Sequence, residues 1–545
     1  MIEQLKSAGD QLRAAWDNYC RVYSGILNYP VLSTPSHAHK FPPELIHQLD
    51  IEIAFIQGYE PKIQEIRIGI SRAHNYWSGL APINTLSPDI LTRIFHFARP
   101  QPCRFHYLNS PKLHERRFPD HLARVCTLWC NIAISSRSLW SHIDIFPCGP
   151  NYNRLITRAE THAERATDKL IELHIAQGVT GRPDRTNRGY YDLYELISRI
   201  SSRVESLEFA VSSNFQGFHR SVLSRLLLSQ PPTLRELIIH SSYDHSDAFI
   251  YAEEFDPDDS DEEFEDFRLN LTEDQVESGF ALLTVLHLNG IFPLWSSVAY
   301  HRLVDLRLFS TDSWSSIEEE ELTNILTSSP GLQILHFGLE IQLLTADSTE
   351  VTPVYLQDLQ IVKIFPYKAA TTLLCPSKVL RLLAPGSKLL RLSFDNYYEP
   401  DDEFIIDFEA FFARSRVVGF YTRSAFPPIS ALLRHAIHLE QIILEDYESV
   451  AFGTPHFTWL EVDSLVSWPR LRSLYVTTSA LSESELRLFV KCCPTGVTLY
   501  ACDVDLDSSE ESMSEELSDI FPTVTITDTP LCPQGDPPAE WDVLI

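Results

Sequence analysis

The chain of 545 residues lacks the features that mark several large classes of protein. Glycine is scarce (19), which argues against flexible linkers, whereas 34 prolines favour many rigid turns and helix ends. Basic residues are outnumbered, with 44 against 74 acidic ones, and the net charge of -30 would repel a phosphate-rich partner. Apolar runs long enough to span a bilayer and an N-terminal secretory signal are also missing. We therefore expect no nucleic-acid partner, no membrane partner and a location inside the cell, in the cytoplasm or the nucleus.

Motifs for catalysis and cofactor binding are missing too. The sequence has no phosphate-binding loop, dinucleotide-binding fingerprint, zinc-protease motif or serine-hydrolase motif. The ten cysteines form no Cys-x-x-Cys pair, so free thiols are expected. Cys126 and Cys130 lie four residues apart on a predicted helix, but no second ligand pair is near them, which favours buried thiols over a zinc site. We predict no catalytic residues, no metal site, no cofactor and no enzymatic activity.

Residues 1–80 are predicted to form an N-terminal helical region. Apolar residues recur at three- and four-residue steps up to Ile26, and a second helical stretch begins near Glu44. That stretch has a heptad seam, made by Leu49, Ile56, Ile63, Ile70 and Trp77. Gly58 and Pro61 interrupt the seam, which predicts two helices or one kinked helix. The seam fits a dimerising coiled coil or an antiparallel helical hairpin, and the internal proline favours the hairpin.

A short apolar pattern repeats within residues 150–500. Its form, Leu-x-x-Leu-x-Leu, places apolar side chains on one side of a short strand. The instances are Leu170-Leu173-Ile175, Val204-Leu207-Phe209, Leu234-Leu237-Ile239, Leu283-Leu286-Leu288, Leu303-Leu306-Leu308, Leu332-Leu335-Phe337, Leu356-Leu359-Ile361, Leu389-Leu392-Phe394, Leu439-Ile442-Leu444 and Leu471-Leu474-Val476, with a weaker one at Val417–Phe420. A helical run ending in a turn precedes several of them. Such units cannot bury their apolar faces singly, so we expect them to stack around one shared core.

This pattern resembles the leucine-rich-repeat family, although no regular asparagine follows the strands. The resemblance implies an α/β fold in which an irregular solenoid has parallel strands inside and helices outside. The alternative is an ordinary α/β domain whose parallel sheet is covered on both faces. In a solenoid, strand residues that point away from the core would contact a protein target, and they include Arg307, His336, Arg391 and Tyr475.

Two acidic stretches accompany the repeats. Residues 252–266 are mostly acidic and are predicted to be a solvated insertion, because like charges repel and ordering the chain costs entropy. Residues 501–545 begin with a similar run and are predicted to be an acidic, mostly irregular C-terminal tail.

Residues 81–146 form a separate helical piece. Ser87, Pro88 and Asp89 suit the first turn of a helix, and a proline-rich connection over 99–119 precedes a second predicted helix. The segment resembles an F-box, through Leu86, Pro88, Ile90, Leu91, Ile94, Phe95, Val125, Cys126, Trp129, Leu139 and Trp140. The connection of about twenty residues is longer than the family minimum, which loop entropy tolerates. An N-terminal helix, an F-box and leucine-rich repeats in this order resemble fungal F-box proteins.

The F-box resemblance implies a substrate-recognition adaptor of an SCF-type cullin–RING ubiquitin ligase. The F-box would dock on the adaptor subunit of the ligase and, through it, join a cullin, while the repeats bind a protein substrate. The residues expected to face the adaptor subunit are Leu86, Pro88, Ile94, Val125, Cys126 and Trp129. Ile90, Leu91, Phe95, Leu139 and Trp140 are expected to form the internal core instead. A ligase-independent leucine-rich-repeat scaffold and an enzyme that uses the repeats as a frame are the alternatives.

Overall fold

The structure is a computed structural model, and it describes part of the chain. The described residues are 2–27, 43–77, 82–98, 118–147, 152–176, 190–211, 217–241, 248–252, 267–309, 316–342, 352–365, 376–395, 402–423, 435–447, 470–493, 495–505, 520–527, 531 and 541. The acidic insertion predicted at 252–266 lies almost wholly outside them. The chain divides into two compact units, of which the first holds residues 1–87 and 126–128 and the second holds the rest.

The first unit is helical. Its helices are α1 (Ile2–Leu27) and α2 (Pro43–Trp77), followed by the short 3-10 helix η2 (Pro82–Thr85). Helix α2 is continuous through Pro61, so the sequence alternative of two separate helices is wrong. Tyr19 of α1 donates a hydrogen bond to Glu52 of α2 at 3.0 Å, which joins the two helices. The seam residues Ile56, Ile63 and Ile70 are exposed along α2.

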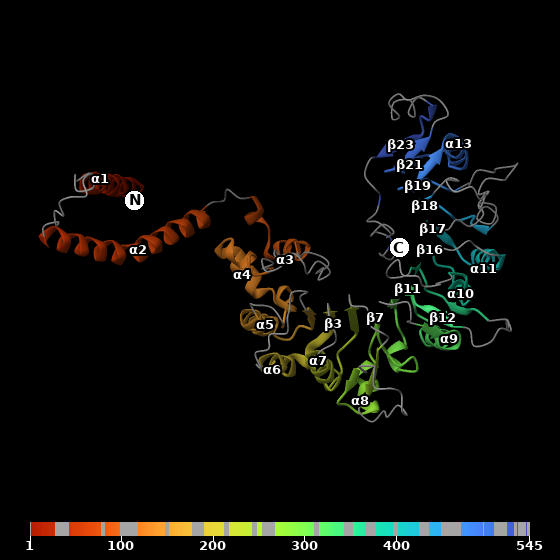
Figure 1. Ribbon diagram of the computed structural model, residues 1–545. Coiled ribbons are helices and arrows are strands. Elements are labelled where there is room, and N and C mark those ends of the chain that lie inside the picture. Colours follow the sequence, from red (N-terminus) through yellow and green to blue (C-terminus); the bar gives the residue numbers. More distant parts are fainter. Residues whose placement is uncertain are drawn as a thin grey trace, which may run out of the picture. The chain divides into compact units, whose positions relative to one another are not determined.

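The second unit is a mixed α/β structure with one large parallel sheet (Figure 1). Its 14 strands lie side by side in chain order. They are β1 (His142–Ile145), β2 (Ile171–Ala176), β3 (Val204–Val211), β4 (Glu236–Ser241), β7 (Val285–Asn289), β9 (Asp305–Phe309), β11 (Ile334–Gly338), β14 (Ile361–Ile364), β16 (Leu390–Asp395), β17 (Val417–Arg423), β18 (Gln441–Glu445), β19 (Ser473–Thr477), β21 (Val497–Tyr500) and β23 (Val524–Thr527). Parallel neighbours need a crossover between them, and helices supply most of these connections.

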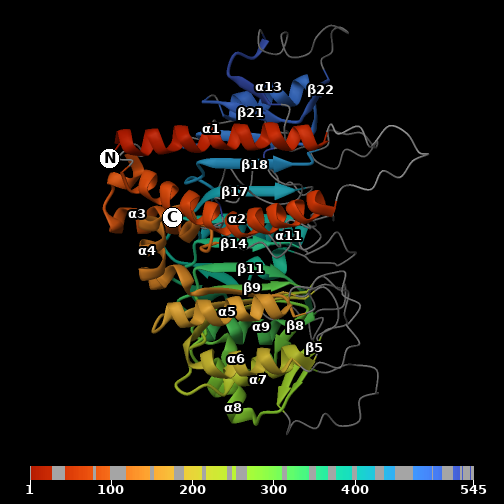
Figure 2. The same ribbon diagram turned by 90° about the vertical axis from the view of Figure 1, so that its left-hand side faces the viewer.

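Helices line one face of this sheet (Figures 1 and 2). They are α5 (Tyr152–Ala166), α6 (Tyr191–Ile200), α7 (Gly217–Leu227), α8 (Glu273–Phe280), α9 (Glu319–Ser328), α10 (Pro376–Leu380), α11 (Asp402–Ala413) and α13 (Glu483–Cys492). Most of the repeated leucines of the strands and the apolar stripes of these helices form one continuous buried core. Leu170 and Leu389 were predicted to belong to it, and this is wrong, because they are exposed and their neighbours Ile171 and Leu390 are buried instead. We call the opposite side of the sheet, where the other strand residues point, the open face.

Minor strands lie in the connections, directly before or after strands of the main sheet. Three pairs are parallel: β10 (Ser316–Glu318) with β12 (Glu340–Gln342), β13 (Val354–Leu356) with β15 (Leu383–Pro385), and β20 (Ala480–Ser482) with β22 (Asp503–Asp505). A further sheet has the order β6 (Phe267–Leu269), β5 (Ala248–Ala252) and β8 (Ile291–Pro293). In the part of the chain that the structure describes, no helix combines the length and apolarity needed to cross a membrane.

The strand pattern places most strands correctly and one strand out of register. On β14, Val362 pairs with Leu335 of the neighbouring strand, so Val362 faces the core and Ile361 faces the other way. The triplet on β14 that points into the core is therefore Leu359-Val362-Ile364; of the predicted triplet, Leu356 and Leu359 lie in the core and Ile361 does not. Side chains alternate between the two faces of a strand, so a displacement by an odd number of residues, here three, moves Ile361 to the face opposite Val362.

The sheet also extends beyond residues 150–500 at both ends. Strand β1 lies within the segment 81–146, and β23 lies within the predicted tail 501–545. Both have the same spacing with an aromatic residue in place of the first leucine, namely Trp140-Ile143-Ile145 and Phe521-Val524-Ile526.

Short helices precede β1. They are α3 (Pro88–Phe97), the 3-10 helix η5 (Leu122–Arg124), α4 (Thr127–Ser135) and the 3-10 helix η6 (Arg137–Trp140). Leu91, Phe95, Leu139 and Trp140 are buried, as the sequence predicts for the core of this segment. Ile90 was assigned to the same core, and this is wrong, because 48% of its surface is exposed. It lies one residue before the buried position on α3, and therefore about 100° round the helix from it.

Candidate functional site

Polar and charged side chains follow the middle of the open face from strand to strand. Because the strands are parallel and in register, residues at equivalent positions lie in a row. From β1 to β19 the row is Asp144, His174, Glu208, Ile238, His287, Arg307, His336, Lys363, Ser393, Tyr421, Ile443 and Tyr475. This row makes the open face the main candidate for a functional surface.

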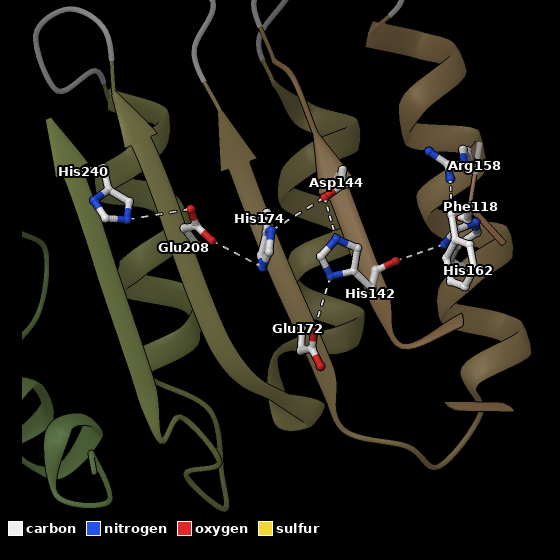
Figure 3. A network of polar contacts seen from close by, with 9 residues as sticks. All are labelled: Phe118, His142, Asp144, Arg158, His162, Glu172, His174, Glu208 and His240. Atoms are coloured by element: carbon white, nitrogen blue, oxygen red, sulfur yellow. Dashed lines mark hydrogen bonds and ion pairs between the residues drawn. The ribbon is translucent and has the colours of Figure 1, made fainter. Parts of the chain in front are cut away.

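At the β1 end of the row, histidines and carboxylates form a contiguous network (Figure 3). The Nε2 atom of His142 lies 2.9 Å from Oδ1 of Asp144, and the Nδ1 atom of His174 lies 3.7 Å from the same oxygen. The other nitrogen of each ring faces a second carboxylate: Nδ1 of His142 is 3.2 Å from Glu172, and Nε2 of His174 is 3.5 Å from Glu208. Two imidazoles thus meet at one carboxylate oxygen, each with a further carboxylate behind it.

The pKa values of Asp144 and Glu208, two carboxyl groups of this network, are shifted in opposite directions. Burial alone would raise the pKa of Asp144, but the imidazoles of His142 and His174 outweigh it and hold the pKa below its ordinary value. Burial raises the pKa of Glu208 to about 7, and the negative charge of Asp144 adds to this shift. The site therefore favours a negative charge on Asp144 and disfavours a second one on Glu208.

A second cluster lies further along the row, on β7, β9 and β11. The guanidinium of Arg307 donates two hydrogen bonds to the carboxylate of Asp305, both at 2.9 Å, and Nε2 of His287 lies 3.1 Å from the same group. Burial would raise the pKa of Asp305, but His287 and Arg307 hold it well below the ordinary value. Arg307 was predicted to contact a target, and here it neutralises a buried carboxylate of its own chain.

His336 of β11 pairs in register with Arg307. Only 2% of its surface is exposed, so its side chain packs within the protein and is poorly placed for the target contact that the sequence predicts. Burial, with the nearby charge of Arg307, lowers its pKa well below the ordinary value, and the ring is neutral at physiological pH.

Arg391 and Tyr475, the other two predicted target contacts, lie near the far end of the sheet. Arg391 lines a pocket of about 310 Å³, together with Leu389, Val418, Gly419, Glu440, Gln441, Arg472 and Ser473. Glu440 and Arg472 form an ion pair of 3.3 Å at its wall. This pocket combines charges of both signs with apolar surface, which suits a protein segment better than a uniformly charged polymer.

Trp541 lies on the open face next to this pocket. Trp541 is buried against Phe365, Tyr421 and Ile443, and Tyr475 packs against the edge of the cluster. A Cβ atom at Gly419 would lie 3.0 Å from the ring of Trp541, which is closer than ordinary contact, so a larger residue there would crowd the indole. Because Tyr475 packs against this cluster, part of its side chain already contacts its own chain and is not available to a target.

The residues predicted to dock on a ligase adaptor subunit are placed as follows. Pro88 and Val125 are exposed, and Leu86, Ile94, Cys126 and Trp129 are half-buried. The ring of Trp129 packs on Phe95 with 4.8 Å between centroids, which ties its inner side to the core. Cys126 and Cys130 are half-buried thiols.

The β1–β2 network is not apparent in the sequence because its histidines and carboxylates come from positions about thirty residues apart. A local signal exists: His-x-Asp at 142–144 and Glu-x-His at 172–174 place two polar residues each on one side of a strand. The alternation indicates a shared face, but only the pairing of β1 with β2 brings the two motifs together.

Comparisons with known proteins add no assignment. No protein-family model matches the chain, and no curated protein matches it significantly.

Proposed function

We propose that this chain is the substrate-recognition adaptor of an SCF-type cullin–RING ubiquitin ligase. In this proposal, residues 81–146 are an F-box that docks on the adaptor subunit of the ligase and, through it, on a cullin. The large sheet and its helices are an irregular leucine-rich-repeat solenoid that binds a protein target in the cytoplasm or the nucleus. The chain contributes no catalytic group.

The observation that carries the proposal is the division of the F-box-like residues into two sets. Leu91, Phe95, Leu139 and Trp140 match the family pattern and are buried. Pro88 and Val125 match it as well and are exposed, Val125 with 52% of its surface. Large apolar side chains at the surface of a small helical segment favour a protein partner. Each anchor that becomes fully buried in a complex would contribute about 1.5–3 kcal/mol.

Hydrogen bonds within the segment support a preformed docking surface. Thr92 of α3 and Ser136 are linked by their hydroxyls at 3.1 Å, and His96 and Ser138 by a contact of 2.9 Å. The indole of Trp140 donates to the carbonyl of Ala133 at 2.7 Å. A surface held in place before binding loses little conformational freedom when the partner arrives.

The target end of the proposal rests on the sheet. Strands in chain order with helices along one face are typical of leucine-rich repeats and leave the other face for ligands. We place target contacts at the pocket around Arg391, where Glu440 and Arg472 also lie. His336 is not among them, because it is buried.

The mechanism is tethering. Holding a target beside the ubiquitin-loaded enzyme raises the effective concentration of its lysines, and no bond is made or broken by this chain. The runner-up is a ligase-independent scaffold, in which the same sheet binds a partner and residues 81–146 bind no ligase subunit.

Co-purification with the ligase adaptor subunit separates these functions. The full chain is expected to recover the adaptor subunit and a cullin, and the double variant Leu86→Ala/Pro88→Ala should lose both. Ile406→Ala is the matched control, because it removes an exposed apolar side chain from helix α11. Equal recovery by the double variant, or no recovery by the unaltered chain, would favour the scaffold.

A further inference from the structure

Three potential metal ligands meet on strands β1 and β2 (Figure 3). They are Nε2 of His142, Oδ1 of Asp144 and Nδ1 of His174, and these atoms all lie within 4.8 Å of one another. The two imidazole nitrogens are 2.9 and 3.7 Å from the Asp144 oxygen. Ligand atoms around tetrahedral zinc are roughly 3.3–3.4 Å apart, given bonds of about 2.0–2.1 Å. Small side-chain movements would therefore bring all three into coordination distance.

The surroundings orient both rings toward this point. His142 presents its Nδ1 to Glu172, and His174 presents its Nε2 to Glu208, at 3.2 and 3.5 Å. A histidine that binds a metal through one nitrogen usually donates the N–H of the other nitrogen to a carboxylate or carbonyl. Both histidines have such a carboxylate partner behind them, and both turn their remaining nitrogen toward Asp144.

A divalent cation placed between the three groups would take one nitrogen lone pair from each ring and one oxygen lone pair from Asp144. Glu172 and Glu208 would stay beside the outer nitrogen of each ring, at 3.2 and 3.5 Å.

We propose that His142, Asp144 and His174 bind a divalent transition-metal ion, for which Zn²⁺ is the reference. Two imidazole nitrogens and one carboxylate oxygen suit zinc and its first-row neighbours, whereas Ca²⁺ and Mg²⁺ prefer oxygen ligands alone. Water completes the coordination. The ion would fasten β1, the edge strand of the sheet, to β2. The proposal does not depend on the ubiquitin-ligase function.

The test is a zinc titration of the chelator-stripped full chain at pH 7.5, in competition with a chromophoric chelator. We expect one tight site per chain, with affinity at least about 100-fold weaker in His174→Ala and in Asp144→Asn. His240→Ala is the matched control. Its Nε2 lies 3.9 Å from Glu208, within the same network, but it supplies no ligand atom. The control should bind zinc as the unaltered chain does.

Cobalt gives a second readout. Co²⁺ bound through imidazole nitrogen produces visible absorption bands, which are expected in the unaltered chain and in His240→Ala and should be lost in both ligand variants. Far-UV circular dichroism verifies the fold, and Asp144→Asn carries the test where His174→Ala does not fold. Equal zinc affinity in the folded ligand variants and the unaltered chain would overturn the proposal. So would affinity no tighter than about 10 µM in the unaltered chain.

Discussion

Trp541 offers a sharp test of the packing on the open face of the sheet. Its indole, 2% exposed, lies on the open face of the sheet against Phe365, Tyr421 and Ile443, away from the main core. Replacing a buried aromatic residue by alanine removes its burial energy and leaves a cavity, at a cost of about 3–5 kcal/mol. Trp541→Ala should therefore lower the free energy of unfolding of the sheet by about this amount. At roughly 2.1 cal/mol/K of unfolding entropy per residue, the Tm of the sheet should fall by on the order of 5 °C.

A second substitution tests the contact itself. In Gly419→Ala the new methyl group would lie 3.0 Å from the Trp541 ring, closer than ordinary contact. We expect a loss of about 1–3 kcal/mol from this crowding. In the Trp541→Ala background the methyl group meets no indole, and the loss should nearly vanish. A double-mutant cycle measures this coupling directly.

The assay is thermal and urea unfolding followed by circular dichroism. The control is Trp16→Ala, which removes a tryptophan that is 54% exposed on α1 and should change the Tm of the sheet very little. An unfolding free energy of Trp541→Ala within about 0.5 kcal/mol of the unaltered chain would refute the packing, as would additive effects in the cycle.

Two further predictions concern carboxylates that each lie beside a histidine and an arginine. Burial would raise the pKa of Asp120, but hydrogen bonding and charge from His162 and Arg158 lower it to about 2, from an ordinary value near 3.8. Asp120 thus stabilises the fold by up to about 2.5 kcal/mol above pH 4, and this is lost as the pH falls from about 4 to 2. Asp120→Asn should remove that dependence from urea-unfolding curves measured across this range, and an unchanged acid limb would contradict the assignment. Arg307→Ala leaves the Asp305 carboxylate without its bidentate partner and should cost about 3–5 kcal/mol of stability, measured by urea unfolding at pH 7. Arg307→Ala with unaltered stability would instead return Arg307 to the surface that contacts the target.

The parallel strands were predictable because their signal is local. A strand such as β9 carries its core residues at fixed spacing, and the helices that precede several of the strands end in a turn that the sequence shows. Where two apolar residues stand side by side, as Ile361 and Val362 do, spacing cannot tell which faces the core. Pairing with Leu335 on β11 decides it.

The polar sites were harder to predict because they depend on pairing between distant segments. His142 and His174 are 32 positions apart and meet only through the register of β1 and β2. His336 was predicted to be exposed, and this prediction used only the alternation of side chains along its own strand. Alternation correctly places it on the open face, but neighbouring side chains on β9 and β14 bury it.

Equilibrium binding of the purified chain to the isolated ligase adaptor subunit tests the central claim most directly. The account predicts saturable binding that weakens at least about 30-fold in Leu86→Ala/Pro88→Ala, as expected for loss of a hot spot worth about 2 kcal/mol. Ile406→Ala should bind like the unaltered chain. Binding that is undetectable in the unaltered chain, or equal in all three proteins, would contradict the account.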